Sequence, residues 1–377
     1  MHENPFIFGE IVSESAFIDR EEELQSLVRD LADGQKLFLL SPRRFGKSSL
    51  VSAAFRQLQT QNVRTVVIPV SSYASYVQFL ERFTDRLLRA AGPWDKVKDW
   101  VGRFINKIKP QANVDLSTGE LSVSFGTGSE IDPAPIAPEV FALPGELAKH
   151  GRFKMAICLD EFQQILNFDG RAVEDALRNA VQLQRDVGYV FSGSQPSLVE
   201  EMLSAKRPFH KAGPKIFLDK IPADSWRNFI LEQFRHRSRA VTDAALDRLL
   251  ATADLIPYDV QRIAHELWDY AELNAKRNLD SDDVDLVTKR LVTGESGFYE
   301  RLWEQLRSSQ RAVLQALAAR GAAEIYAQAV RQEYRLGPAS SVQRALQSLD
   351  DQDILDRYHD FYFFVDPLFA VWIRNNR

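Results

Sequence analysis

Hydrophobic and polar residues follow two different patterns along this chain, one in its first half and one toward its C-terminus. Residues 19–34 carry apolar side chains at helical spacing, and a glycine follows the last turn. Residues 36–40 are an apolar run of the kind found in strands that are buried on both faces. A helix is expected from Ser48, and a second apolar run follows it at 64–70. This order of strand, loop, helix and strand predicts an α/β fold with a parallel sheet and helices on both faces.

The strand pattern returns at 154–162 and 188–195, and from Pro222 onward the spacing of apolar residues is helical. The change of pattern near Pro222 predicts a domain boundary. We therefore assign residues 1–221 to an α/β domain and residues 222–293 to a helical domain.

A second boundary is expected at 293–297, so that residues 298–377 form a third domain. This segment contains short helices and ends in a hairpin, whose turn is expected near His359 and Asp360. Three helices and a hairpin in a segment of this length are typical of a winged helix.

Residues 94–144 interrupt the α/β pattern and are interpreted as an insertion in the first domain. Alternating residues around Thr118 and Gly119 predict a hairpin there. The proline-rich residues 129–145 are expected to form a connector.

Composition limits the function classes. The chain has 377 residues, a formal net charge of -5 and a single cysteine, Cys158, which excludes an internal disulfide framework. The N-terminus lacks the basic and apolar segments of a signal peptide. The apolar residues near the C-terminus are interrupted by Asp366 and Pro367 and are too few to cross a bilayer, which takes about 20 apolar residues. We expect a soluble, cytoplasmic protein with no membrane contact.

The loop after the first predicted strand has the features of a phosphate-binding loop. Its backbone N–H groups at the start of a helix would converge on anionic oxygens, Lys47 would reach the outer phosphates, and the Ser48 hydroxyl would join a Mg²⁺ shell. Gly46 allows the close approach, whereas Ser41 stands where a glycine is expected. The candidate nucleotide-binding residues of this loop are Ser41, Pro42, Arg43, Arg44, Phe45, Gly46, Lys47, Ser48 and Ser49.

Two further strand ends carry polar residues. Asp160 and Glu161 end an apolar strand, and they suit a residue that orients Mg²⁺-bound water and a general base, respectively. Taken alone, the same pair is typical of a solvated strand end or a helix cap. Ser194 or Gln195, at the end of the next strand, would contact the γ-phosphate or the attacking water, or would simply form a polar turn.

The chain resembles the archaeal-type ATPases of the STAND branch of the AAA+ superfamily. The resemblance rests on LLSPRRFGKSSL, AICLDEF, FSGSQPSLVEEML and PYDVQRIAHELW, and on the winged-helix segments GPASSVQRALQSLDDQDILDR and YFFVDPLFAVWIR. It covers nearly the whole chain apart from residues 94–144. It implies ATP or ADP with Mg²⁺ as ligands, a P-loop domain followed by a helical lid and a winged helix, and tolerance of a non-glycine residue at the first loop position.

By this resemblance, the segment FIDREEEL passes beside the adenine. It implies Phe17, Ile18 and Arg20 as base-side residues, together with Ile11 and Val12. The alternative is an ordinary helix start.

The resemblance also implies a phosphate-sensing residue in the lid, which is Tyr258, Gln261 or Arg262. Their spacing does not choose among them. Where the family often has an arginine after the third strand, this chain has Lys211, which keeps the charge but lacks the planar fork of arginine.

Arg43 and Arg44 have two interpretations. They would grip a phosphate or an acidic partner segment and so report which nucleotide is bound, or they would pair with carboxylates on the surface.

The expected recognition helix of the winged helix carries only one basic residue, Arg344, and ends in Asp350 and Asp351. DNA binding relies on lysine and arginine that neutralise phosphates, so DNA is a weakly supported partner. Three function classes remain. The favoured class is a Mg²⁺-dependent ATPase that acts as a slow molecular switch, with a protein partner or self-association through the winged helix or the insertion. The others are a nucleotide-controlled DNA-binding protein and a nucleotide-binding scaffold that does not hydrolyse.

Overall fold

The computed structural model describes residues 4–12, 17–91, 113–115, 122–125, 132–358 and 361–377. The chain divides into two compact units. The sheet unit comprises Arg20–Ser41 and Lys47–Leu218, and the helical unit comprises Met1–Asp19, Pro42–Gly46 and Asp219–Arg377. The five residues Pro42–Gly46 thus belong by their contacts to the helical unit, although the segments on either side of them belong to the sheet unit.

The sheet unit is built on a five-stranded parallel sheet in the order β2-β5-β6-β1-β7. Its strands are β1 (Lys36–Leu40), β2 (Arg64–Pro69), β5 (Met155–Asp160), β6 (Val187–Gly193) and β7 (Lys215–Phe217). Leu40 pairs with Gly193, and Pro69 pairs with Asp160. The carboxyl ends of β1, β5 and β6 therefore lie along one edge, which is where α/β proteins place their ligands.

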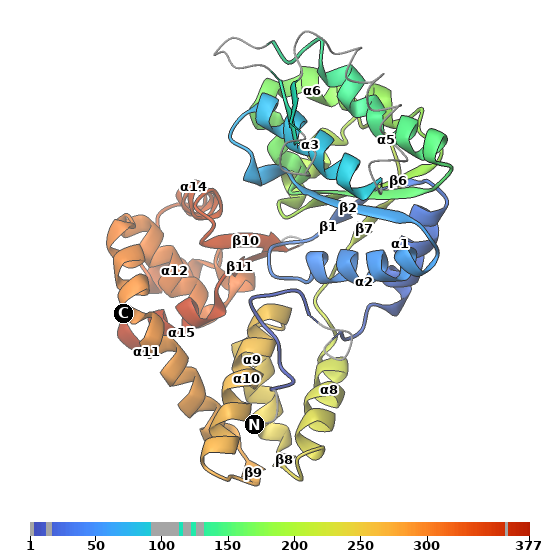
Figure 1. Ribbon diagram of the computed structural model, residues 1–377. Coiled ribbons are helices and arrows are strands. Elements are labelled where there is room, and N and C mark those ends of the chain that lie inside the picture. Colours follow the sequence, from blue (N-terminus) through green and yellow to red (C-terminus); the bar gives the residue numbers. More distant parts are fainter. Residues whose placement is uncertain (1–3, 13–16, 92–112, 116–121, 126–131, 359–360) are drawn as a thin grey trace. The chain divides into compact units, whose positions relative to one another are not determined.

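Helices cover both faces of this sheet, as the sequence predicted (Figure 1). On one face lie α1 (Glu21–Ala32) and α2 (Lys47–Thr60), and on the other lie α3 (Tyr76–Ala90), α5 (Ala137–Gly151) and α6 (Leu166–Val181). Strand β6 is buried along its whole length, and β1 and β5 are buried except at one end residue each. Such burial on both faces explains their continuous apolar sequence. Phe38, Phe83, Phe141 and Phe191 belong to the core on the α3, α5 and α6 side.

The expected proline-rich connector is wrong in part, because residues 137–151 form helix α5. Pro138 lies in the first turn, where its missing N–H costs no helical hydrogen bond. Pro144 lies inside the helix, which continues because Val140, Phe141 and Leu147 are buried in the core. Tertiary packing therefore overrides the local effect of Pro144.

Only part of the predicted insertion lies within the described residues. Two short antiparallel strands, β3 (Asn113–Asp115) and β4 (Ser122–Ser124), occur where the hairpin was predicted. Its predicted turn at Thr118 and Gly119 lies outside the described residues.

The helical unit begins with α8 (Ala223–Arg235), α9 (Asp243–Thr252), α10 (Pro257–Leu273) and α11 (Ser281–Gln305). Two short strands, β8 (Ala240–Val241) and β9 (Asn278–Leu279), form a parallel pair. The predicted boundary at 293–297 lies within α11, which runs without interruption through Gly294 and Gly297.

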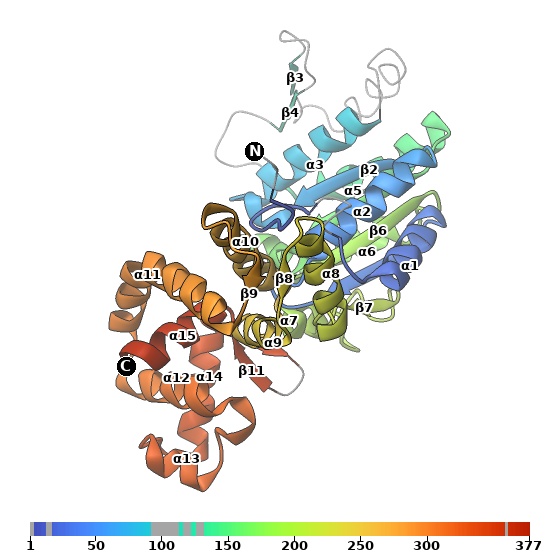
Figure 2. The same cartoon turned by 90° about the horizontal axis from the view of Figure 1, so that it is seen from below.

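The C-terminal part of the helical unit has the elements of a winged helix. They are α12 (Ser308–Arg320), η4 (Ala322–Glu324), α13 (Gln328–Glu333), α14 (Ala339–Asp350), β10 (Leu355–Tyr358), β11 (Phe361–Phe364) and α15 (Pro367–Asn376). Strands β10 and β11 are antiparallel, which confirms the predicted hairpin strands, and the turn at 359–360 lies outside the described residues. Helix α15 lies beside α12 and α11 (Figure 2), with Trp372 against Tyr299 and Trp303. Among the described helices, none is long and apolar enough to cross a membrane.

Candidate functional site

The two ends of the predicted phosphate-binding loop contact each other. Lys47, the first residue of α2, is buried, and its Nζ donates to the carbonyl oxygen of Ser41 at 3.0 Å and to the Ser41 Oγ at 3.2 Å. The following residue, Ser48, is exposed. The first N–H groups of a helix have no intrahelical partner, so the start of α2 presents donors to an anion.

Backbone geometry explains why serine is accepted at position 41. Positive φ angles in this loop occur at Arg44 (68°) and Gly46 (93°), and Ser41 is not among the positive-φ residues. Glycine is needed where φ is positive, and Gly46 meets that need. The Ser41 hydroxyl also binds the lysine that a phosphate would attract, so the departure at Ser41 costs the loop no conformational freedom that it needs.

Polar residues follow the ends of β5 and β6, and two of them contact each other. Asp160 is the last residue of β5, and Glu161 follows it in the left-handed conformation with φ 54° and ψ 46°. Ser194 follows β6, is 1% exposed, and donates a short hydrogen bond from its Oγ to Glu161 Oε2. Left-handed conformation costs a non-glycine residue about 1–3 kcal/mol and clusters at functional sites. The structure therefore brings Glu161 and Ser194 together.

Gln163 is a residue of this group that sequence reasoning missed. It lies in η3 (Phe162–Ile165), is 3% exposed, and its Nε2 donates to Glu161 Oε2 at 2.6 Å. The signal that could have found it is a glutamine two residues after the acidic pair. Glutamine at the start of a helix is more often solvated, and only the left-handed turn at Glu161 brings it back to the carboxylate.

The middle of the loop contacts the winged-helix part of the helical unit. Arg43 forms an ion pair with Asp353 at 2.8 Å, with both side chains about half exposed. Phe45 is 1% exposed and packs against the rings of Tyr358 and Phe363, on β10 and β11. Two loop residues therefore anchor to the strands of the hairpin and to the segment before it.

Arg44 joins the loop to the first turn of α10. Its guanidinium donates to the Val365 carbonyl at 3.0 Å, lies 4.7 Å from the centre of the Tyr258 ring, and is 3.8 Å from the Asp259 carboxylate. The Tyr258 N–H also donates to the Arg44 carbonyl at 3.4 Å. Burial raises the pKa of Asp259 to about 8, although Arg44 opposes this shift and Asp366 adds to it. The lid candidate Tyr258 therefore contacts the loop residue Arg44 through both its ring and its backbone.

The other two lid candidates have partners elsewhere in the helical unit. Gln261 is buried, and its Oε1 accepts a hydrogen bond from the Ile7 N–H at 3.2 Å. Arg262 donates to Glu295 at 2.8 Å, on α11. In these contacts both residues support the fold.

The predicted adenine-side residues have different surroundings within their own units. Val12 and Ile18 pack against the apolar core of the helical unit, and Ile11 is 53% exposed. Phe17 is half-buried. Arg20 belongs to the sheet unit and pairs with Glu23 at 3.0 Å.

Lys211 stands where the resembled family often has an arginine, and the same segment of this chain contains an arginine at position 207. Lys211 is exposed, whereas the Arg207 guanidinium pairs at 3.0 Å with Glu174, whose side chain is fully buried in α6. Burial raises the pKa of Glu174, and Arg207 opposes that shift. The arginine of this segment therefore compensates a buried carboxylate within the sheet unit.

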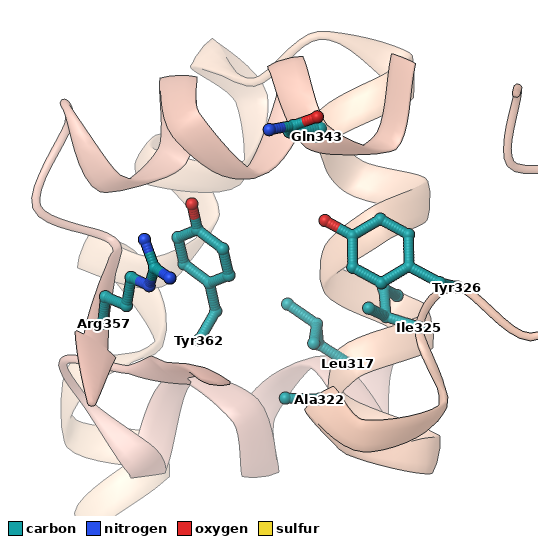
Figure 3. Close-up of a pocket in the computed structure, with 7 residues that line it drawn as sticks. All are labelled: Leu317, Ala322, Ile325, Tyr326, Gln343, Arg357 and Tyr362. Atoms are coloured by element: carbon teal, nitrogen blue, oxygen red, sulfur yellow. The ribbon is translucent and has the colours of Figure 1, made fainter. Parts of the chain in front are cut away.

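A pocket of about 130 Å³ lies within the winged-helix part (Figure 3). Leu317 and Ile325 line it with apolar surface, and Gln343, on α14, and the hydroxyls of Tyr326 and Tyr362 line it with polar atoms.

Desolvation, together with the neighbouring carboxylates Asp356, Asp351 and Asp353, raises the pKa of Asp350, at the end of α14, to about 6. This acidic end of α14 is a poor surface for a phosphate backbone.

Comparisons with known proteins agree with this architecture. Residues 297–375 match a family model described as "Probable winged helix domain". The chain is similar to a Walker-type ATPase of Pyrococcus abyssi, with 17% identity and a TM-score of 0.65 over 98% of this chain and 99% of the other. The ORC2 protein of Aeropyrum pernix, solved in ADPNP and ADP complexes, has 14% identity and a TM-score of 0.59 over 99% and 96%. The ORC1 protein of the same organism, solved in complex with DNA, has 12% identity and a TM-score of 0.52 over 92% and 87%. This chain has the fold of the AAA+ ATPases. No curated protein sequence matches it.

The residues at the sheet edge of this AAA+ fold suit ATP and Mg²⁺. Lys47 is a buried cation at the start of a helix, and it is held by oxygen atoms of Ser41 that a phosphate would replace as its partners. Ser48 and Asp160 offer the hydroxyl and carboxylate oxygens that Mg²⁺ prefers. The donor set therefore fits the triphosphate and its metal ion.

Proposed function

We propose that this chain is a Mg²⁺-dependent ATPase that works as a slow nucleotide-controlled switch of the STAND type. The observation that carries the proposal is the meeting of Glu161 and Ser194 at the sheet edge where Lys47 begins α2. Phosphoryl transfer to water uses a residue that positions or deprotonates the water together with groups that bind the phosphates, and Glu161 and the start of α2 would supply these parts. The AAA+ fold supports it independently.

Each residue has a role in the proposed reaction. The α2 N–H groups and Lys47 bind the phosphates, and Ser48 and Asp160 hold Mg²⁺, which would neutralise charge on the phosphate oxygens. Glu161 accepts a proton from the attacking water as the water oxygen bonds to the γ-phosphorus. The bond from that phosphorus to the bridging oxygen breaks, which gives ADP and inorganic phosphate. Ser194 orients the carboxylate.

The bound nucleotide would affect the rest of the protein by changing the contacts of the phosphate-binding loop. Its middle residues, Arg43, Arg44 and Phe45, have their partners in the helical unit, so a phosphate that attracts an arginine side chain competes with Asp353 or Asp259. We propose three functional parts, a nucleotide domain at 1–221, a lid at 222–293 and a winged helix at 298–377. Tyr258 is the proposed lid sensor, and the base-side contacts remain proposed for Ile11, Val12, Phe17, Ile18 and Arg20.

The proposed output is a protein partner or a second copy of the chain, bound by the winged helix. A nucleotide-controlled DNA-binding role has the winged helix in its favour. The exposed surface of α14 offers only Arg344 as a basic side chain, and its end is acidic, so salt-sensitive DNA binding is not expected.

The test is ATP turnover by the wild type beside Glu161→Gln, with Glu200→Gln as the matched control. Glu200 is an exposed glutamate of α7 (Pro196–Met202) in the same unit. We expect kcat to fall by about 100-fold or more in Glu161→Gln, with ATP affinity kept, because a general base contributes factors of roughly 10²–10⁴. The Glu200→Gln control should keep the wild-type rate. ATP binding without phosphate release by the wild type would instead favour the non-hydrolysing scaffold.

A further inference from the structure

Gln163 forms a closed triangle of hydrogen bonds with the proposed base. Its Nε2 donates to Glu161 Oε2 at 2.6 Å and to Ser194 Oγ at 3.4 Å. Ser194 Oγ donates to the same Glu161 Oε2. Two donors therefore converge on one carboxylate oxygen, and Oε1 takes no part in the triangle.

The number of protons fixes the orientation of the Gln163 amide. An amide NH₂ has two hydrogens and a hydroxyl has one, and all three are used within the triangle. Turning the amide over would point its carbonyl oxygen at the Glu161 carboxylate and replace an attraction by a repulsion. The side chain of Gln163 therefore has a single favourable orientation.

This arrangement leaves the other end of the amide without a partner. Gln163 Oε1 is buried and accepts no hydrogen bond from the part of the chain that the structure describes. It faces Gly193, where a Cβ atom would lie 3.2 Å from Oε1 and 2.4 Å from Val199 Cγ2. An unpaired buried carbonyl lowers stability, and an apolar residue of similar size would avoid that cost. The cost of the unpaired carbonyl therefore offsets what the Nε2 hydrogen bonds to Glu161 and Ser194 contribute to stability.

We infer that Gln163 is a positioning residue of the proposed ATPase, which holds Oε2 of Glu161 so that Oε1 is the oxygen left to accept the proton of the attacking water. The inference rests on the proposed function and assigns it a further residue. Two effects oppose each other. Donors to a carboxylate weaken it as a base, whereas fixing its orientation favours proton transfer. Misplacement of a reacting group by about 1 Å costs roughly 100-fold, so orientation should dominate.

The first experiment compares Gln163→Leu with Gln184→Leu. Gln184 is the matched control because it is also buried in the sheet unit, yet its Nε2 donates to the Phe141 carbonyl at 2.7 Å and its Oε1 accepts from Tyr189 at 2.6 Å. For Gln163→Leu we expect kcat to fall about tenfold or more, with KM for ATP within twofold and Tm unchanged or raised. For Gln184→Leu we expect the reverse, a lower Tm with an unchanged kcat. Gln163→Met provides a second, unbranched variant for the same measurements.

The second experiment is a double-mutant cycle with Glu161→Gln. A residue that acts through Glu161 should have little further effect once that carboxylate is gone, so Gln163→Leu should change the residual rate less than twofold in the Glu161→Gln background. A purely structural role would lower the rate by the same factor in both backgrounds.

The outcomes separate the two proposals. An active wild type whose Gln163→Leu and Gln163→Met variants keep or raise kcat overturns the positioning role and leaves the proposed function intact. A lower Tm in both variants, with losses that are additive to Glu161→Gln, also overturns it. If the wild type binds ATP but releases no phosphate, the hydrolytic function fails first and the positioning role fails with it.

Discussion

The two ends of the parallel sheet differ in whether certain buried polar atoms have hydrogen-bond partners. At the amino end, both ends of the Gln184 amide are paired, with the Phe141 carbonyl and the Tyr189 hydroxyl. At the carboxyl end, Gln163 Oε1 and Ser192 Oγ are buried without a hydrogen-bond partner among the described residues. Gln184 at the amino end is thus fully paired, whereas Gln163 and Ser192 at the carboxyl end each keep an unpaired buried oxygen atom.

Lys36 shows how complete the pairing at the amino end is. Its Nζ donates to the carbonyl oxygens of Gly34 and Gln184, and burial lowers its pKa to about 8, with a further contribution from Arg178. A buried polar group that is paired stabilises a fold, whereas an unpaired one costs stability and is retained where binding or chemistry needs it. The difference supports the proposal that the carboxyl end carries the site, whereas the amino end supports the fold.

The largest effect should come from the carboxyl end, where Lys47→Ala removes the buried cation. We expect ATP affinity to fall by about 1000-fold or more, because the lysine neutralises the outer phosphates. Isothermal titration with ATP and Mg²⁺ measures it, and circular dichroism checks the fold. Affinity within threefold of the wild type would place the nucleotide elsewhere.

The buried carboxyl group of Asp259 extends the comparison to the helical unit. The folded-state pKa of Asp259, about 8, lies above its ordinary value of 3.8, so the folded chain holds a proton that the unfolded chain releases. The free energy of unfolding should therefore fall as pH rises from about 4 to about 8, by about 1.4 kcal/mol for each pKa unit of the shift. Asp259→Asn should remove this dependence, so that the variant matches the wild type near pH 4 and exceeds it near pH 9. Urea unfolding at several pH values tests this, and parallel pH curves for the two proteins would contradict it.

At the amino end, Tyr189→Phe removes the hydroxyl that donates to Gln184. The Gln184 Oε1 atom is then buried and unpaired, so unfolding should become easier by about 1–3 kcal/mol. Steady-state ATP turnover should not change. A loss of kcat without a loss of stability would contradict the assignment of stability to the amino end and of the proposed site to the carboxyl end.

The smallest effect is expected for Arg43→Gln. Its ion pair with Asp353 is about half exposed on both sides, and exposed pairs contribute about 0–1 kcal/mol. Unfolding should therefore change by less than about 0.5 kcal/mol, and less still in high salt. An Asp353→Asn variant with the same small change would confirm that the pair is weak. A loss of several kcal/mol would show that this anchor of the loop is a main support of the fold.

The sequence predicted the relative positions of polar residues where those positions follow from the direction of the strands. Glu161 and Ser194 were predicted to lie at one edge because parallel strands end together, and Ser194 does donate to Glu161. The hairpin strands near the end of the winged helix were also predicted, and β10 and β11 pair antiparallel. Gln163 was missed because its position depends on the φ angle of Glu161, which no sequence pattern gives.

The lid and the base-side segment were less predictable. Gln261 pairs with Ile7 across 254 positions of sequence, and the loop residue Arg44 pairs with Val365 across 321. Contacts at such separations depend on how whole elements pack, and local periodicity contains no information on them. The boundary expected at 293–297 stays a prediction, and helix α11 continues through it with Val292 and Tyr299 buried on either side.

Helix α11 has a consequence for how the chain tolerates changes in length. It has 25 residues and is therefore about 37 Å long, with Val284 and Val287 in the core near its start and Tyr299 and Trp303 in the core near its end. Inserting a single residue between these pairs would turn the second pair by about 100° relative to the first. Trp303 would then face away from Trp372. Length changes in this helix should therefore be tolerated only in steps that restore its phase, and a loop at the same place would impose no such condition.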